Sequence, residues 1–354
     1  MTVSMARLLE IPEPRRERLQ EVVRRATGAR RVVLITHVNS DADGIGSEAA
    51  VAAWLESRGT RVSIVNPSPI PEPLRFLVHR RELVLDHAGG SGARAIETAD
   101  LVLVLDTSEP DRIAPIDRLI DPAKTWVVDH HPPGLAVLGQ GGVQDPTAAA
   151  TGELVYDMIT LAGDEWTDES SFATYVALVS DTGSFRFSNT SPRAHAIAAD
   201  LLAKGIDPEE VFRRLYAVAP MRRLELLREA LARLQHDPEL GLAWIVLPRD
   251  VTDRLGSTAD DFDGLIDHAR SLQGTRVAML LRETEDGETK LSLRSSDDTD
   301  VNRIARRFGG GGHVKASGAT IPLPGHQAVE EVLKAVREEM ANGEEGRGTE
   351  NFEF

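Results

Sequence analysis

Aspartate and histidine residues directly follow short apolar runs at four places in the sequence. The four segments are THVNSDADGIGSE with His37, Asp41 and Asp43, LVLVLDTSE with Asp106, WVVDHHPPG with Asp129, His130 and His131, and VALVSDTGSFRF with Asp181. Carboxylates and imidazoles bind divalent cations and transfer protons. Each residue alone has an ordinary explanation as a helix cap, a turn residue or a surface group. The combination of all four segments in one chain is what indicates a site that binds cations and transfers protons.

The elements that must position these side chains are short strands and helices. The runs 31–36, 61–65, 101–106 and 125–129 are apolar and rich in β-branched residues, and residues 45–58 between the first two have a helical pattern. This alternation predicts a parallel sheet covered by helices on both faces. The carboxyl ends of parallel strands meet at one edge of a sheet. We therefore expect His37, Asp106 and Asp129 to share that edge.

Carboxylates gathered at one edge would repel each other and raise each other's pKa, and divalent cations would relieve this conflict. The chain has no cysteine. A ligand set of oxygen and imidazole favours two divalent ions, manganese first and Mg²⁺ or Co²⁺ next, over a structural zinc site. His37 and Asp41, four residues apart, can reach one ion, and Asp43 can point to another. Asp106 has two oxygens and can bridge both ions, as in two-metal phosphoryl transfer.

The second half of the chain predicts a different organisation. We expect a first domain over 1–218, a helical connector over 219–238, a second domain over 239–341 and a disordered acidic tail over 342–354. Three strands over 242–248, 275–283 and 289–295 come first in the second domain, with Asp286-Gly287 as a hairpin turn between the last two. A helix at 300–308, a strand at 314–321 and a helix at 326–341 complete it.

A glycine run in the second domain could hold an anion. Gly310, Gly311, Gly312 and His313 lie in FGGGGHVKASG, and consecutive glycines let backbone N–H groups approach a phosphate. Arg294 and His313 are the best candidates to bind a terminal phosphate or a base, although a flexible glycine hinge would give the same pattern. Arg186 could reach the substrate phosphate or pair with a surface carboxylate.

The composition limits the partners. The net charge of −16 argues against a protein that grips long duplex nucleic acid, but it allows a short anionic substrate. No apolar run is long enough to span a bilayer and no signal peptide is evident, so we expect no membrane contact. The lack of cysteine fits the cytoplasm. The sequence is compatible with a homodimer.

Together these residues resemble the DHH phosphoesterase family, named for the triplet Asp129-His130-His131. SLRS at 292–295 and FGGGGHVKASG at 308–318 look like the DHH-associated C-terminal domain, and the resemblance covers residues 20–341. It implies an α/β fold with a parallel-sheet N-terminal domain, a smaller α/β substrate-binding domain and an active site in the cleft between them.

The resemblance also implies roles for the site residues. It assigns one metal to His37, Asp41 and Asp106, and the second to Asp43, Asp106, His130 and Asp181. It assigns Asp129 to orienting the histidines, and His131 to the scissile phosphate and the leaving group.

The compact layout is similar to the nanoRNase and pAp-phosphatase branch of the family. That branch hydrolyses RNA of about two to five nucleotides to mononucleotides, and adenosine 3′,5′-bisphosphate (pAp) to AMP. The nearest alternative is a soluble phosphodiesterase acting on pApA or cyclic di-AMP. A nucleotide-binding sensor on the same scaffold is the non-enzyme alternative, although such proteins typically lose ligands and this chain has the full set.

Overall fold

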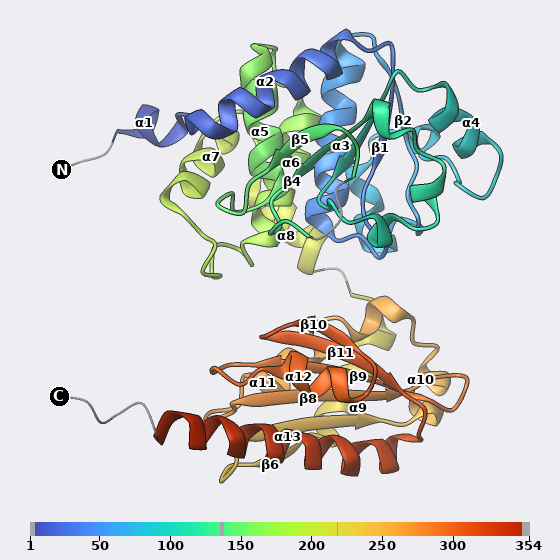
Figure 1. Cartoon of the computed structure of the whole chain (residues 1–354), viewed down its shortest axis with the longest axis vertical. Helices are drawn as coiled ribbons and strands as arrows, with labels where there is room; N and C mark the ends of the chain where they lie inside the picture. Colours follow the sequence, from blue (N-terminus) through green and yellow to red (C-terminus); the bar gives the residue numbers. More distant parts are fainter. Residues whose placement is uncertain (1–3, 135–137, 218, 349–354) are drawn as a thin grey trace. The chain divides into compact units, whose positions relative to one another are not determined.

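The computed structural model describes residues 4–134, 138–217 and 219–348, with the side chains of 260 and 342–348 left out of the description. The chain divides into two compact units, Met1–Val218 and Ala219–Phe354 (Figure 1). Each unit is built around its own sheet, as expected for two domains with separate cores.

The first unit contains a five-stranded parallel sheet in the order β2-β1-β3-β4-β5. The strands are β1 (Arg31–Ile35), β2 (Arg61–Ile64), β3 (Leu101–Leu105), β4 (Thr125–Asp129) and β5 (Gly141–Gln144). The first four confirm the strands predicted from the sequence. The edge strand β5 was missed because GGVQ is short and glycine-rich, which weakens a strand pattern.

Both faces of this sheet are buried, which explains why its strands are apolar without alternation. Leu34 and Leu103 point into one cluster, whereas Val33 and Val102 point into another. The first cluster packs under α2 (Glu13–Gly28), α3 (Ala42–Ser57), α5 (Thr151–Ala162), α6 (Asp168–Asp181), α7 (Pro192–Leu202) and α8 (Pro208–Tyr216). The second packs under α4 (Ser91–Thr98) and the 3₁₀ turns Pro110–Ile113 and Ile116–Arg118. The short helix α1 (Met5–Leu9) precedes them and contacts α7.

Helix α3 begins at Ala42, earlier than the predicted Ile45, because Asp41 caps it. The Asp41 carboxylate accepts hydrogen bonds from the backbone N–H of Asp43 (3.0 Å) and Gly44 (3.1 Å). Aspartate is a preferred residue at this position since it satisfies the free N–H groups of the first turn. The cap also fixes the direction of the Asp41 side chain.

The second unit contains a six-stranded mixed sheet in the order β10-β11-β9-β8-β7-β6. The strands are β6 (Gln235–Asp237), β7 (Leu242–Leu247), β8 (Val277–Glu283), β9 (Thr289–Ser295), β10 (Gly311–His313) and β11 (Ala316–Ile321). Only β7 and β8 run parallel. Helices α12 (Val301–Arg307) and α13 (Gly325–Gly348) cover one face, and α9 (Met221–Ala232) and α11 (Leu265–Arg270) the other; α10 (Arg249–Leu255) packs on α9.

Two boundaries differ from the sequence-based expectation. The segment predicted as a connector contains α9, whose Leu226 and Ala230 are buried in the core of the second unit. Helix α13 continues to Gly348, so residues 342–348 are helical rather than irregular, and 349–354 lie outside the described residues. Within the described part of the chain, no helix is both long and apolar enough to cross a membrane.

Candidate metal centre

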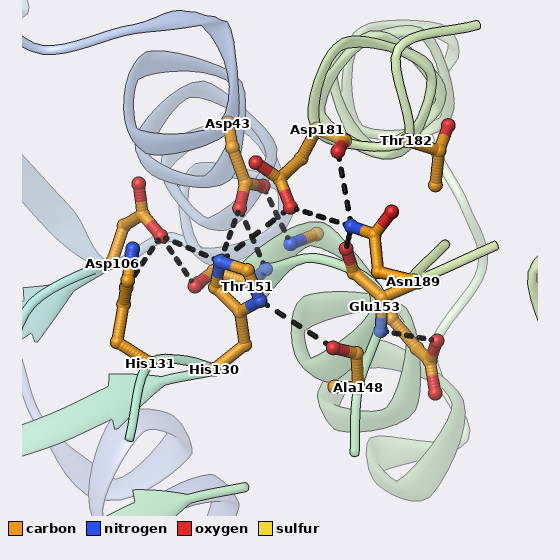
Figure 2. A network of polar contacts seen from close by, with 12 residues as sticks. Asp43, Asp106, His130, His131, Ala148, Thr151, Glu153, Asp181, Thr182 and Asn189 are labelled. Atoms are coloured by element: carbon orange, nitrogen blue, oxygen red, sulfur yellow. Dashed lines mark hydrogen bonds and ion pairs between the residues drawn. The ribbon is translucent and has the colours of Figure 1, made fainter. Parts of the chain in front are cut away.

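The acidic and histidine residues singled out in the sequence converge at the carboxyl end of the first sheet. Figure 2 shows most of them pointing toward one another. His37 follows β1, Asp106 follows β3, and the triplet beginning at Asp129 lies at the end of β4. Asp41 and Asp43 lie at the start of α3, and Asp181 is the last residue of α6.

The donor atoms form three overlapping groups, one of which is made by Asp106, His130 and His131. The donor atoms of His37, Asp41 and Asp106 all lie within 4.8 Å of one another, and so do those of Asp43, His130 and Asp181. Ligands about 2.1 Å from one ion and at right angles to each other lie about 3 Å apart. Small side-chain movements would bring the donor atoms to these spacings, so both of these groups are candidate divalent cation sites.

Asp106 lies between the two groups. Its Oδ2 is 3.4 Å from His37 Nε2, and its Oδ1 is 3.7 Å from His130 Nε2, so each oxygen faces one group. Its backbone has φ of 64°, a left-handed conformation that is uncommon for a residue other than glycine and that concentrates at functional sites. This conformation turns the carboxylate at the end of β3, and the resulting geometry suits a bridging ligand.

The two histidines predicted as ligands, His37 and His130, have ring orientations fixed by their backbone surroundings. His37 Nδ1 lies 2.9 Å from the carbonyl oxygen of Val38, and His130 Nδ1 lies 3.4 Å from that of Ala148. A carbonyl can only accept, so each Nδ1 carries a hydrogen, and each Nε2 can offer its lone pair to a cation once its own proton is lost. Both Nε2 atoms point toward the carboxylates, as a metal ligand requires.

Burial and mutual repulsion shift the pKa values of the acidic residues in the metal-free protein. Burial raises the pKa of Asp43 well above its usual value, and the charges of Asp106, Asp181 and Asp41 raise it further. Burial likewise raises the pKa of Asp181 to about 6, although His130 opposes the shift. Burial also acts to raise the pKa of Asp106, but the hydrogen bond with His37 and the nearby imidazole charges outweigh it and lower that pKa. Bound cations would compensate the negative charge, so this donor set fits metal ions.

The Asp129 carboxylate orients His131. Its Oδ1 lies 2.8 Å from His131 Nδ1 and accepts the backbone N–H of the same residue at 3.0 Å. Burial acts to lower the pKa of His131, yet the hydrogen bond to Asp129 and the charges of Asp106 and Asp129 raise it overall. The imidazole is therefore held by Nδ1 while Nε2 remains available, the arrangement of a proton donor.

The start of α5 supports the ligands, which the sequence did not predict. Asp43 accepts the backbone N–H groups of Thr151 (2.7 Å) and Gly152 (2.9 Å), and the Thr151 hydroxyl donates to Asp106 Oδ1 at 2.8 Å. Helix N-termini favour anions because their first N–H groups lack partners. A threonine opening a helix is a common capping signal, so nothing marked Thr151 as part of the site.

A buried ion network holds this helix start in place. Arg15 of α2 and Arg193 of α7 both bind Glu153 and Asp157 of α5, with N–O distances between 2.6 and 3.0 Å. Glu153 also accepts the backbone N–H of Ala149. On the other side, Asn189 donates to the carbonyl oxygen of Ala149 (2.8 Å) and to Asp181 Oδ2 (3.2 Å). These residues are far apart in the sequence, so a search for short motifs does not detect the network.

The residues predicted to bind substrate are not members of these ligand groups. Arg186 is exposed, donates to the carbonyl oxygen of Gly183 at 2.6 Å, and forms no ion pair with any described residue. In the second unit, Arg294 and His313 both pair in register with Ala316, so all three point to the same face of the sheet.

The last two glycines of the run lie in a short strand that the sequence did not predict. Gly311–His313 is strand β10, and an ideal Cβ on Gly310 would lie 2.1 Å from the carbonyl oxygen of Gly318. Glycine is thus required by close strand pairing. Phosphate binding by Gly310, Gly311 and Gly312 remains a prediction.

Comparisons with known proteins agree with the geometry. The model of the DHH family N-terminal domain matches residues 31–179, and that of the DHHA1 domain matches residues 247–342. The bifunctional oligoribonuclease and PAP phosphatase NrnA of Thermus thermophilus is 34% identical over 93% of this chain and 97% of its own length. The protein of the same name from Bacillus subtilis is 29% identical over 85% of this chain and 92% of its own.

Solved structures show the same fold. An exopolyphosphatase-related protein from Bacteroides fragilis matches with a TM-score of 0.85 at 24% identity, over 92% of this chain and 97% of that protein. RecJ of Thermus thermophilus in complex with Mn²⁺ matches with a TM-score of 0.54 at 16% identity, over 94% of this chain and 55% of that protein. With both family domains matched in order and a relative of this identity aligned almost end to end, the chain belongs to the DHH phosphoesterase family.

Proposed function

We propose that this protein hydrolyses RNA of a few nucleotides to mononucleotides, and pAp to AMP, with two divalent cations, manganese foremost. The observation that carries the proposal is the position of Asp106, whose two oxygens face two separate groups of ligands. The activities printed in the names of the Thermus and Bacillus relatives support the choice of substrate. A cytoplasmic location and a homodimer remain predictions.

The chain's own residues provide binding, orientation and proton transfer. When bound, a pair of divalent cations activates water and neutralises the phosphate oxygens. His37, Asp41 and Asp106 would hold one ion, while Asp43, Asp106, His130 and Asp181 would hold the other. His131, held by Asp129 and favoured in its protonated form, gives its Nε2 proton to the leaving oxygen.

Recognition of the substrate needs cationic and aromatic groups close to the metal ligands. Arg186 follows Asp181 by a few residues and has no competing carboxylate partner among the described residues, which favours phosphate over a surface ion pair. The adjacent Phe187 exposes 51% of its surface, and an aromatic face there can stack on a base. We propose Arg294, Gly310, Gly311, Gly312 and His313 as contacts to the far end of the substrate.

The test is side-by-side hydrolysis with Mn²⁺ of pAp, pApA, RNA of a few nucleotides, a long RNA, cyclic di-AMP and pyrophosphate. We expect pAp and the short RNAs to be hydrolysed most efficiently, by comparison of kcat/KM. A preference for cyclic di-AMP or pApA would replace the proposed substrate, and equal rates on the long RNA would remove the length limit. Purified protein without bound metal and without turnover would instead support a nucleotide sensor.

A further inference from the structure

A cavity of about 450 Å³ lies within the first unit, beyond the carboxyl end of the edge strand β2. We call it the edge pocket and define it by Asn66, Ser68, Ile70, Arg75, Arg81 and His87, which line it together with neighbouring residues of 69–86. Asn66 and Ser68 directly follow the edge strand β2. Ligands of open α/β proteins bind outside the carboxyl ends of strands, and small-molecule pockets measure roughly 300–1,000 Å³.

The lining combines an apolar wall with cationic groups. Ile70 and Val78 are almost fully buried behind the pocket, which suits the flat face of a base. Arg75 and Arg81 are exposed, and neither forms an ion pair with a carboxylate among the described residues. The lining contains one acidic residue, Asp86, so cations outnumber it in a protein whose net charge is −16. This local excess favours an anion.

The pocket wall is tied to the segment that carries a metal ligand. Asn66 Oδ1 accepts the backbone N–H of Thr36 at 2.9 Å, and Ser68 Oγ accepts the backbone N–H of Asn39 at 2.8 Å. His37 lies between those two backbone donors in the sequence. On the far side, the His87 Nδ1 lies 3.0 Å from the carbonyl oxygen of Asn66 and donates to it. The pocket and the metal centre therefore share a rigid strand end.

We propose that the edge pocket binds a further nucleotide of an oligonucleotide whose scissile phosphate lies at the metal centre. The base packs on the apolar wall, and Arg75 and Arg81 bind its phosphate. This inference rests on the proposed function and adds a second nucleotide site to it. A pAp molecule contains one nucleoside and cannot occupy both places, so the pocket serves oligonucleotides and leaves pAp hydrolysis unaffected.

The test compares substrates of different length in the full-length protein. The double variant Arg75→Ala/Arg81→Ala should raise the KM for diadenylate and triadenylate at least about tenfold. The reason is that losing a hydrogen bond between an arginine and a phosphate lowers the affinity by about that factor or more. The KM for pAp should stay within about twofold of the wild type. Arg80→Ala is the matched control, because Arg80 is a neighbouring exposed arginine that pairs with Glu56 and lies outside the lining. It should leave all three KM values unchanged.

A second variant fills the pocket instead of removing charge. Val84 lines the cavity and exposes 37% of its surface, so Val84→Trp should block the site and also raise KM for the oligonucleotides alone. Binding of diadenylate to chelator-treated protein, measured by equilibrium dialysis, gives a readout that needs no turnover. The double arginine variant should weaken this binding at least about tenfold.

The outcomes separate the two proposals. Unchanged dialysis affinity in the double variant, or an equal rise in KM for pAp and triadenylate, overturns the edge pocket while the proposed function stands. A wild-type protein that binds diadenylate through these arginines but hydrolyses neither it nor pAp overturns the function while the pocket stands.

Discussion

Replacing Thr151 with valine should weaken metal binding while leaving the fold intact. The Thr151 hydroxyl donates to Asp106 Oδ1 at 2.8 Å, and both residues are almost fully buried. Valine has nearly the same shape, and the backbone N–H of residue 151 would still donate to Asp43. The variant therefore removes a single hydrogen bond from the carboxylate that lies between the two ligand groups.

The expected size follows from that contact. A hydrogen bond to a charged group contributes about 1.5–3 kcal/mol, which is about a 10- to 150-fold change in an equilibrium constant. Groups that orient metal ligands typically contribute about 10- to 100-fold to metal affinity or activity. We therefore expect Thr151→Val to weaken Mn²⁺ binding by about 10- to 100-fold.

Isothermal titration of chelator-treated protein with Mn²⁺ measures this effect. Thr174→Val is the matched control, because Thr174 is equally buried but its hydroxyl donates to the Ser170 carbonyl oxygen within α6. The control should bind Mn²⁺ like the wild type. Unchanged affinity and kcat in Thr151→Val, or equal losses in both variants, would refute the role assigned to this hydroxyl.

Three further predictions concern the same centre. Asp106→Asn removes the charge but keeps a side chain that tolerates the left-handed backbone. The unfolding midpoint should therefore be retained while kcat falls at least about 100-fold, and near-normal kcat would exclude Asp106 as a shared ligand. Gly44→Ala places a Cβ 2.5 Å from Thr36 Oγ1 and should cost about 1–3 kcal/mol in urea unfolding, whereas Gly28→Ala, with nothing within 4 Å, should cost nothing measurable. The pKa of Asp181 rises to about 6 in the metal-free protein, so the folded state binds this proton more tightly than the unfolded state does. The resulting stabilisation is complete below about pH 4 and is lost as the pH rises past 6. Mn²⁺ must displace that proton, so its increase in Tm should be larger at pH 7 than at pH 5, and an equal increase would contradict the assignment.

The strands and the ligands after them could be predicted because both depend on local sequence. Apolar runs such as LVLVLD mark strands buried on two faces, and the parallel arrangement then places Asp106 and His37 at one edge. The position of Asp181 at the end of α6 does not follow from strand order, and it was placed by family resemblance.

The support around the ligands could not be predicted, since it depends on contacts between distant segments. Arg15 meets Glu153 and Asp157 across 138 and 142 residues of sequence. The edge pocket likewise forms only when the segment 84–87 returns beside β2, with Val84 paired to Ile64. In the second unit, strand β10 was not predicted because the close approach of β10 to β11 is not visible in the sequence.

Anomalous diffraction at the manganese edge from crystals grown with Mn²⁺ tests the central claim most directly. We expect two peaks roughly 3.5–4 Å apart in the first unit, one bound by His37, Asp41 and Asp106 and the other by Asp43, Asp106, His130 and Asp181. A single peak, or peaks away from Asp106, would contradict the two-metal centre.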